Sequence, residues 1–255
     1  KPDSFESGSG IGVRGQVEGR QLQLGNTALM ADAGVDATPL SNRAEQLRLE
    51  GISIVYLAVD GVLAGLLAVS DPIKPTSKQA VTRLQEVNVK VIMATGDGLT
   101  TAKAVARELG IEEVHGEVKP QDKEKLVADL QSSGRRVAMA GDGINDAPAL
   151  ARADVGIAMG TGTDVAMNSA QVTLVKGDLM GILRARTLSV ATVKNMRQNL
   201  AFAFIYNAMG IPLAAGVLYP LTGHLLSPMI AALAMSVSSA SVVFNALRLR
   251  KIRID

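Results

Sequence analysis

Residues 137–150 read V-A-M-A-G-D-G-I-N-D-A-P-A-L, an apolar run followed by two glycines and two aspartates. The run at 137–140 predicts a buried strand, the glycines permit a sharp turn, and the residues from 145 to 153 predict a helix. Ligands of open α/β sheets lie at the carboxyl ends of strands. Asp142 and Asp146 therefore stand where such a sheet would hold a ligand.

Two aspartates on one loop suit a Mg²⁺ ion beside a phosphate. Mg²⁺ takes oxygen ligands, usually one or two protein carboxylates completed by phosphate oxygens and water. A calcium loop or a simple turn remains the alternative, because Asp and Gly also favour turns. The sequence thus predicts that Asp142 and Asp146 bind Mg²⁺.

Strands and helices alternate from residue 66 to residue 180, which is typical of a parallel sheet with helices on both faces. Residues 1–65 carry several glycines and short alternating runs, which predict a small α+β lobe. The expected strands of the parallel sheet are 66–70, 89–94, 137–140, 155–159 and 172–175, and the expected helices are 77–87, 100–109, 122–132 and 145–153.

Further polar motifs lie near the ends of these strands. Thr95-Gly96-Asp97 follows the strand 89–94, so the Thr95 hydroxyl and the Gly96 amide can donate to phosphate oxygens. An ordinary strand-to-helix turn is the alternative. Lys123 can neutralise an aspartate or a phosphate, although a solvated surface lysine is the default for any single lysine.

The interval between Arg197 and Arg248 contains no Asp, Glu, Lys or Arg. It splits at residues 220–224 into two apolar stretches of about 20 residues, each long enough to span a bilayer. Basic residues flank both ends, which places both flanks in the cytoplasm. The sequence therefore predicts a linker helix at 181–197, two transmembrane helices within 198–247 and a basic tail at 248–255.

Polar side chains at bilayer depth are costly and are functional candidates by default. The first span carries Tyr206 and Asn207, and the second carries Met235 and Ser239, which share a helix face. A thioether, a phenol and a carboxamide without a carboxylate suit Cu(I) or Ag(I) better than Zn²⁺ or Ca²⁺. Helix packing is the alternative, because small residues join transmembrane helices and Met fills gaps.

Composition narrows the classes of protein. The 255 residues are 47% hydrophobic, which is enough to bury a core and favours more than one domain. A net charge of +2 is too small to argue for a nucleic-acid partner. With no cysteine, the chain can form no disulfide or thiolate metal site. It starts in a polar stretch without Met or a signal peptide, so we expect a C-terminal part of a longer protein.

Taken in order, these motifs resemble the P-type ATPases, cation pumps whose phosphorylation domain belongs to the haloacid dehalogenase superfamily. The resemblance implies a Rossmann-like α/β phosphorylation domain at 66–180 and the latter part of the nucleotide-binding domain at 1–65. The motifs that carry it are D-P-I-K-P at 71–75, T-G-D at 95–97, K-P-x-D-K at 119–123, G-D-G-x-N-D at 141–146 and A-D-V-G-I-A-M-G at 153–160.

The resemblance also implies roles for single residues, with Mg²⁺ and ATP as cofactors. Thr95 would contact the aspartyl phosphate, Lys123 would stabilise charge there, and Asp142 would bind Mg²⁺. Gly10-Ile11-Gly12 resembles the glycine pair that lets the backbone approach ATP, although an isolated G-x-G is a weak signal. The catalytic set that the resemblance implies is Thr95, Gly96, Asp97, Lys123, Asn145 and Asp146.

The membrane hairpin resembles that of the copper-exporting heavy-metal subgroup, whose last two helices carry Y-N and M-S-x-S-S. Zinc and cadmium exporters place an aspartate in the last helix, and this chain has none there. The resemblance implies an ATP-driven exporter of Cu(I) or Ag(I), in a plasma (bacterial inner) membrane, with both ends of this chain cytoplasmic. The implied partners are the ion, the lipid membrane and a copper chaperone.

Several motifs of such pumps are absent from the chain and would lie in a missing N-terminal part of the same pump. They are the phosphorylated D-K-T-G-T motif, the T-G-E loop of the actuator domain, the Cys-Pro-Cys helix and the His-Pro motif. Three alternatives stay open: a zinc- or cadmium-type pump, a membrane-anchored phosphatase of the same superfamily, and a regulatory fragment that binds nucleotide without turnover. His115 and His224 are expected to have structural, solvated roles, because neither has a second His nearby.

Overall fold

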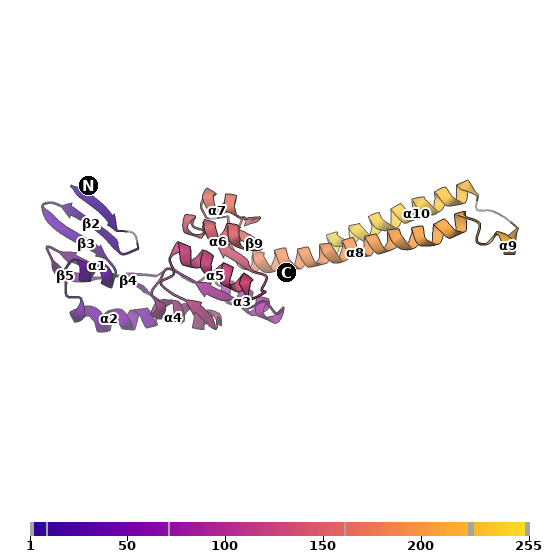
Figure 1. The fold of residues 1–255 in the computed structure, drawn as a ribbon. Helices are drawn as coiled ribbons and strands as arrows, with labels where there is room; N and C mark the ends of the chain where they lie inside the picture. The colour runs from indigo at the N-terminus through magenta and orange to yellow at the C-terminus, as the bar shows by residue number, and fades with distance from the viewer. Residues whose placement is uncertain (1–2, 9, 71, 161, 224–226, 253–255) are drawn as a thin grey trace. The chain divides into compact units, whose positions relative to one another are not determined.

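The computed structural model describes residues 3–8, 10–70, 72–160, 162–223 and 227–252. Asp71 of the D-P-I-K-P motif, His224 and the end of the basic tail lie outside these residues. The chain divides into two compact units, Lys1–Met180 and Gly181–Asp255, whose elements are labelled in Figure 1. The first unit contains all the strands, and the second contains only helices.

An antiparallel sheet in the order β1-β2-β3-β4-β5 begins the first unit. Its core consists of buried side chains from β4 packed against α1 and α2, among them Tyr56 and Leu29. This is an α+β arrangement, as the sequence predicts. The elements are β1 Ser4–Gly8, β2 Gly12–Val17, β3 Arg20–Gly25, α1 Thr27–Asp32, α2 Thr38–Leu49, β4 Ser53–Val59 and β5 Val62–Val69.

The prediction that residues 66–70 form a strand of the parallel sheet is wrong. These residues fall in β5, which pairs antiparallel with β4. Asp60 and Gly61 between the two strands have φ values of 50° and 77°. Positive φ at both central residues is the geometry of a tight hairpin turn, so the chain folds straight back. The expected lobe boundary after residue 65 therefore falls inside β5.

Two parallel sheets follow, one pairing β6 with β7 and the other in the order β10-β9-β8. Among the described residues, β6 and β8 each have an edge without a partner strand, so the single predicted parallel sheet is present in two pieces. The strands are β6 Ile92–Ala94, β7 Glu113–His115, β8 Ala138–Gly141, β9 Val155–Met159 and β10 Val172–Leu174.

Helices connect these strands, as expected for α/β units. The predicted helix at 145–153 is in fact a 3₁₀ turn followed by α6, because Pro148 cannot donate a backbone hydrogen bond and fits only near a helix start. Strand β7 and helix α7 were not predicted. The helices are α3 Ser77–Glu86, α4 Leu99–Leu109, α5 Pro120–Ser132, the 3₁₀ turn η1 Ile144–Asp146, α6 Ala147–Arg152 and α7 Asp164–Ser169.

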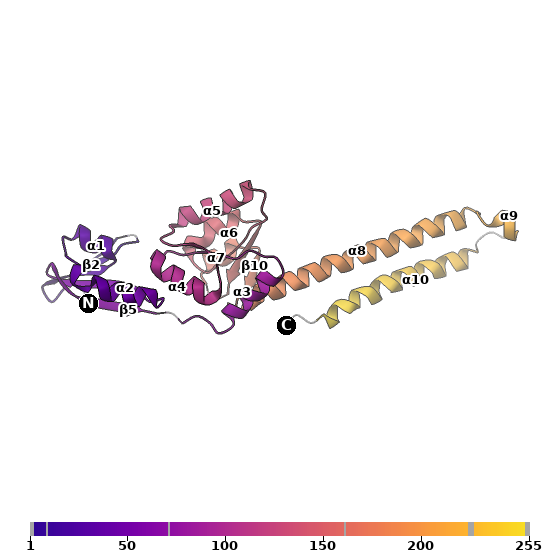
Figure 2. The same cartoon turned by 90° about the horizontal axis from the view of Figure 1, so that it is seen from below.

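The second unit consists of α8 Met180–Ala214, α9 Tyr219–Thr222, α10 Pro228–Leu247 and η2 Arg248–Lys251. Helices α8 and α10 run antiparallel and side by side (Figures 1 and 2). The expected border between a linker helix and a first span at 197/198 falls inside α8, because no Gly or Pro interrupts the sequence there. Helix α8 ends two residues after Pro212.

One described segment, Ala232–Lys251, is long and apolar enough to cross a membrane by length and composition. The apolar part of α8 begins after Asn199 and ends with the helix at Ala214, so it is shorter than the about 20 residues that a span needs. The structure thus gives one candidate span where the sequence predicts two, and the two-span hairpin stays a prediction.

Close packing of α1 on β3 generates a first prediction. A Cβ at Gly25 would lie 2.2 Å from the Ile11 carbonyl oxygen and 2.4 Å from Leu29 Cδ2. We expect Gly25→Ala to lower the free energy of unfolding by about 1–3 kcal/mol, as overpacking does. Urea unfolding measures this. Gly65→Ala is the matched strand control, because its Cβ would meet nothing within 4 Å; equal losses in both variants would contradict the packing explanation.

Candidate functional site

The loop after β8 is folded around the side chain of Asp146. Its Oδ2 accepts hydrogen bonds from the backbone N–H groups of Asp142 at 3.3 Å and Gly143 at 3.1 Å. Only glycine fits at position 141, because a Cβ there would lie 2.7 Å from the Cβ of Asp146. The carboxylate of Asp146 therefore fixes the turn that carries Asp142.

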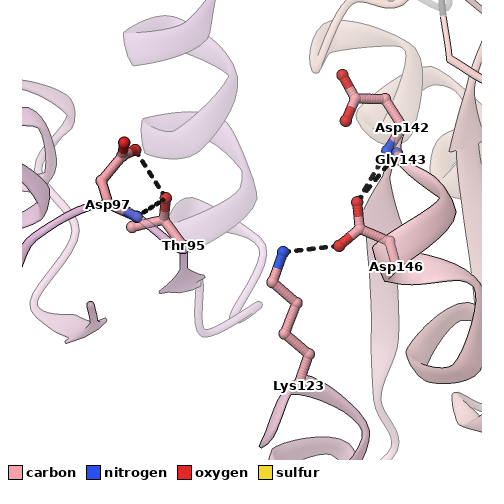
Figure 3. A network of polar contacts seen from close by, with 6 residues as sticks. All are labelled: Thr95, Asp97, Lys123, Asp142, Gly143 and Asp146. Carbon is pink, nitrogen blue, oxygen red and sulfur yellow. Dashed lines mark hydrogen bonds and ion pairs between the residues drawn. The ribbon is translucent and has the colours of Figure 1, made fainter. Parts of the chain in front are cut away.

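Lys123 and Asp146 form a largely buried ion pair. Lys123 Nζ lies 2.7 Å from Asp146 Oδ1, and Asp146 is only 6% exposed. Figure 3 shows the lysine side chain reaching from α5 toward this carboxylate. Both oxygens of Asp146 are thus engaged, one by the ammonium and the other by the loop backbone.

Asp142, in contrast, presents a free carboxylate. Its side chain is exposed, makes no hydrogen bond or ion pair with any other described residue, and in Figure 3 points away from Asp146. The backbone of Asp142 is fixed by the loop after β9, because the Asp142 carbonyl oxygen accepts a hydrogen bond from the Thr163 N–H at 2.9 Å. A Cβ at Gly162 would lie 2.3 Å from the same oxygen.

The supporting role of Gly162 and Thr163 was not predicted. They follow the A-D-V-G-I-A-M-G run. A glycine at position 162 can indicate that another part of the backbone comes close, but the sequence does not show that this part is Asp142. Twenty residues separate Gly162 from Asp142, so only the pairing of β8 with β9 brings the two loops together.

The loop fits a Mg²⁺ ion that is shared with a phosphate. Among the described residues, no group of three or more Asp, Glu, His or Cys side chains is placed to hold a metal. A Ca²⁺ site of protein ligands needs six or more oxygens, whereas Mg²⁺ needs one or two carboxylates completed by phosphate and water. One free carboxylate, that of Asp142, therefore suits Mg²⁺ better than Ca²⁺.

Thr95, Gly96 and Asp97 follow β6 as predicted. Thr95 Oγ1 donates to Asp97 Oδ2 at 2.8 Å and accepts from the Asp97 N–H at 3.2 Å (Figure 3). Asp97 Oδ1 accepts from the Ser53 hydroxyl of β4 at 3.1 Å, a contact that the sequence did not predict. Asp97 thus ties the motif to the antiparallel sheet, while Gly96 is exposed and its N–H makes no hydrogen bond within the described part of the chain.

The remaining predicted residues of the first unit, Gly10, Gly12 and Asn145, make no side-chain hydrogen bond with a described residue that would tie them to a ligand site. Gly12 has φ 140°, and a Cβ there would lie 2.3 Å from the Leu24 carbonyl oxygen, so strand packing alone accounts for this glycine. Gly10 has φ 77° and open space around it. Asn145 is exposed, and its side chain makes no hydrogen bond with the other described residues.

His115 takes part in a surface cluster on β7. Its Nε2 lies 3.2 Å from Glu113 Oε1, and Lys90 Nζ lies 2.5 Å from Glu113 Oε2. The hydrogen bond from Lys90, followed by that from His115, lowers the pKa of Glu113. The Glu113 side chain therefore forms its ion pairs with Lys90 and His115, outside the loop of Asp142.

The four residues predicted to bind the transported ion lie on two helices. Tyr206 and Asn207 are on α8, and Met235 and Ser239 are on α10; all four are exposed. No hydrogen bond among the described residues joins one pair to the other. The second unit alone thus shows the four side chains without a closed coordination site.

Comparison with protein-family models matches residues 4–154, more than half of the chain, to haloacid dehalogenase-like hydrolases. A copper-transporting P-type ATPase of Rhizobium leguminosarum bv. viciae is 59% identical over 96% of this chain and 29% of its own length. A silver-exporting P-type ATPase of Salmonella typhimurium is 55% identical over 98% of this chain and 30% of its own length. The chain therefore spans about a third of the length of these curated relatives.

Among solved structures, a zinc-transporting PIB-type ATPase in the E2.Pi state is similar over 98% of this chain and 39% of its own. The two are 31% identical with a TM-score of 0.69. The similarity extends over both units of this chain.

The ion pair in the loop generates a second prediction. Lys123→Met leaves the buried Asp146 carboxylate without its cation, and we expect the free energy of unfolding to fall by about 3–5 kcal/mol. Thermal or urea unfolding measures this. Lys90→Met removes one of the two partners of Glu113 at the surface and should cost less than about 1 kcal/mol. A Lys123→Met loss as small as the Lys90→Met loss would show that the buried pair does not hold the loop.

Proposed function

Because this chain belongs to the haloacid dehalogenase-like hydrolase family and forms part of a heavy-metal P-type ATPase, we propose that it supplies the Mg²⁺ and phosphate site of an ATP-driven Cu(I) or Ag(I) exporter. The observation that carries the proposal is the outward carboxylate of Asp142 on a loop that Asp146 and Lys123 hold in place. The phosphorylated aspartate of the pump would lie in the D-K-T-G-T motif, outside this chain.

In this proposal each residue has one task. Asp142 binds Mg²⁺, which when bound neutralises charge on the transferred phosphoryl group. Asp146 positions Asp142 through the backbone of the loop, and its direct ligation of Mg²⁺, expected from the sequence, stays a prediction. Lys123 supplies the ammonium that attracts the phosphate to the site.

The residues after β6 complete the phosphate site. The Gly96 N–H donates to a phosphate oxygen. The Thr95 hydroxyl, whose single proton goes to Asp97 Oδ2 at 2.8 Å in the free site, turns that proton to a phosphate oxygen when phosphate binds. The exposed amide of Asn145 is a further donor. A strand from elsewhere in the pump would fit between the free edges of β6 and β8 and bring the phosphorylated aspartate to both loops.

The lobe at 1–65, extended to the end of β5, would bind ATP. The ATP would approach the backbone at Gly10, because no other atom lies within 4 Å of a Cβ placed there. Gly12 would serve mainly to pack the strands there. The phosphorylation domain would extend from there to about residue 180. Switching between the phosphorylated and unphosphorylated states would then open the membrane site to alternate sides.

For the transported ion, we propose Cu(I) or Ag(I), bound by Tyr206, Asn207, Met235 and Ser239. The absence of charged side chains from this part of the sequence and the presence of Met235 support a soft monovalent cation. The copper and silver exporters are 59% and 55% identical, against 31% for the zinc transporter of known structure. A zinc- or cadmium-type pump and a membrane-anchored phosphatase are the alternatives.

The proposed setting is a membrane that both α8 and α10 cross, with the flanking basic residues on the cytoplasmic side. The span Ala232–Lys251 supports the second crossing, since only 6% of its apolar window is buried within the protein. The proposed partners are lipid, the upstream domains of the same pump and a chaperone that delivers copper.

A third prediction tests the ion. ATP hydrolysis by the full-length, membrane-reconstituted protein should be stimulated by Cu(I) and Ag(I) but not by Zn²⁺, and Met235→Ala should raise the concentration for half-maximal stimulation at least about tenfold, because a soft ligand is lost. Met229→Ala, also exposed on α10, is the matched control and should behave like the wild type. Stimulation by Zn²⁺ alone would favour the zinc-type pump, and turnover indifferent to all three ions would favour a phosphatase.

A further inference from the structure

A cluster of amide side chains joins α8 to α10 within the second unit. Asn195 is 7% exposed and Asn245 is 6% exposed, although most side chains around them are exposed. Asn195 Nδ2 donates to the Asn245 carbonyl oxygen at 2.7 Å, and Asn245 Nδ2 donates to Asn199 Oδ1 at 2.8 Å. These two hydrogen bonds run between the helices in opposite directions.

Other hydrogen bonds complete the cluster. Asn199 Nδ2 donates to Asn195 Oδ1 at 3.2 Å, and Asn245 Nδ2 also lies 3.4 Å from Gln198 Oε1. Arg248 Nη1 donates to Asn245 Oδ1 at 3.1 Å. The Asn245 side chain thus uses both of its polar atoms, and a shift along or around either helix would leave buried polar atoms unpaired, which is costly.

The position of this cluster sets the relative depth of residues farther along both helices. Met235 lies ten residues before Asn245, and Asn207 lies ten residues beyond position 197, midway between Asn195 and Asn199. Antiparallel helices rise equally, by about 1.5 Å per residue, so both residues lie about 15 Å from the cluster. The cluster therefore places Asn207 and Met235 at the same level, with Tyr206 one residue away.

We propose that Asn195, Asn199 and Asn245 are positioning residues that fix the register of α8 against α10 and thereby align the two halves of the ion site. Polar side chains can join transmembrane helices without further consequence. A buried asparagine is, however, also the means by which paired helices fix one register among several. The identity of the ion rests on the proposed function, whereas the register itself does not.

The register can be measured without any ion. Ala203 and Ser238 are half-buried and lie six residues beyond position 197 and seven before Asn245, so they are nearly level. With Ala203→Cys and Ser238→Cys in the full-length protein, we expect oxidation to give the 203–238 disulfide, detected by mass spectrometry. Adding Asn245→Leu should lower its yield several-fold. An unchanged yield would overturn the proposal, whether or not the protein transports copper.

The functional consequence is tested by Cu(I)-stimulated ATP hydrolysis of the full-length pump. Asn245→Leu should raise the Cu(I) concentration for half-maximal stimulation by about tenfold, because the hydrogen bonds from the Asn245 side chain to Asn199 and Gln198 are lost. It should leave the KM for ATP within about twofold. Ser241→Ala is the matched control, because among the described residues its hydroxyl bonds only to the Ser238 carbonyl oxygen of its own helix, at 2.7 Å. An unchanged Cu(I) dependence would overturn the alignment role, as would a KM for ATP that rises by the same factor.

If the wild-type protein shows no stimulation by Cu(I) or Ag(I), the proposed function fails, and the yield of the disulfide still decides the register. If stimulation is present and the disulfide forms equally with and without Asn245, the positioning role fails and the proposed function stands. The two proposals can thus fail separately.

Discussion

The Lys123–Asp146 ion pair is the interaction on which the candidate site depends. Asp146 is buried, and a buried carboxylate persists only when it is paired and hydrogen-bonded. Lys123 of α5 satisfies one oxygen, and the amides of Asp142 and Gly143 satisfy the other. Because Asp146 is committed inward, Asp142 is left pointing outward with a free carboxylate. The chemistry expected of the loop therefore follows from how the charge on Asp146 is compensated.

The site is built from two parts that the described chain does not join by strand pairing. The aspartates follow β8, and Thr95 to Asp97 follow β6, yet each of these strands is the edge of its own parallel sheet. The Ser53 hydroxyl of β4 donates a hydrogen bond to Asp97, so the T-G-D motif also contacts the antiparallel sheet. Such an arrangement suits a pump in which nucleotide binding and phosphorylation must be coupled.

Local features were predictable from the sequence, and contacts between distant residues were not. Strand β9 has the predicted bounds of 155–159, because a buried apolar run with flanking turns determines it. Strand β5 was assigned to the wrong sheet, since its apolar residues suit either sheet and only the hairpin turn at Asp60 decides. The support of Asp142 by Gly162, and the hydrogen bond of Ser53 to Asp97, depend on tertiary packing that no spacing reveals. The role predicted for Asp142 as the Mg²⁺ ligand is still untested.

The measurement that tests the central claim most directly is the Mg²⁺ dependence of phosphorylation of the full-length protein by inorganic phosphate, compared between wild type and Asp142→Asn. If Asp142 is the Mg²⁺ ligand, the variant should need at least about tenfold more Mg²⁺ for half-maximal phosphorylation. Asp154→Asn, whose carboxylate pairs with Arg136 on the protein surface, should keep the wild-type dependence. An Asp142→Asn variant with wild-type Mg²⁺ dependence would contradict the account and place the metal elsewhere.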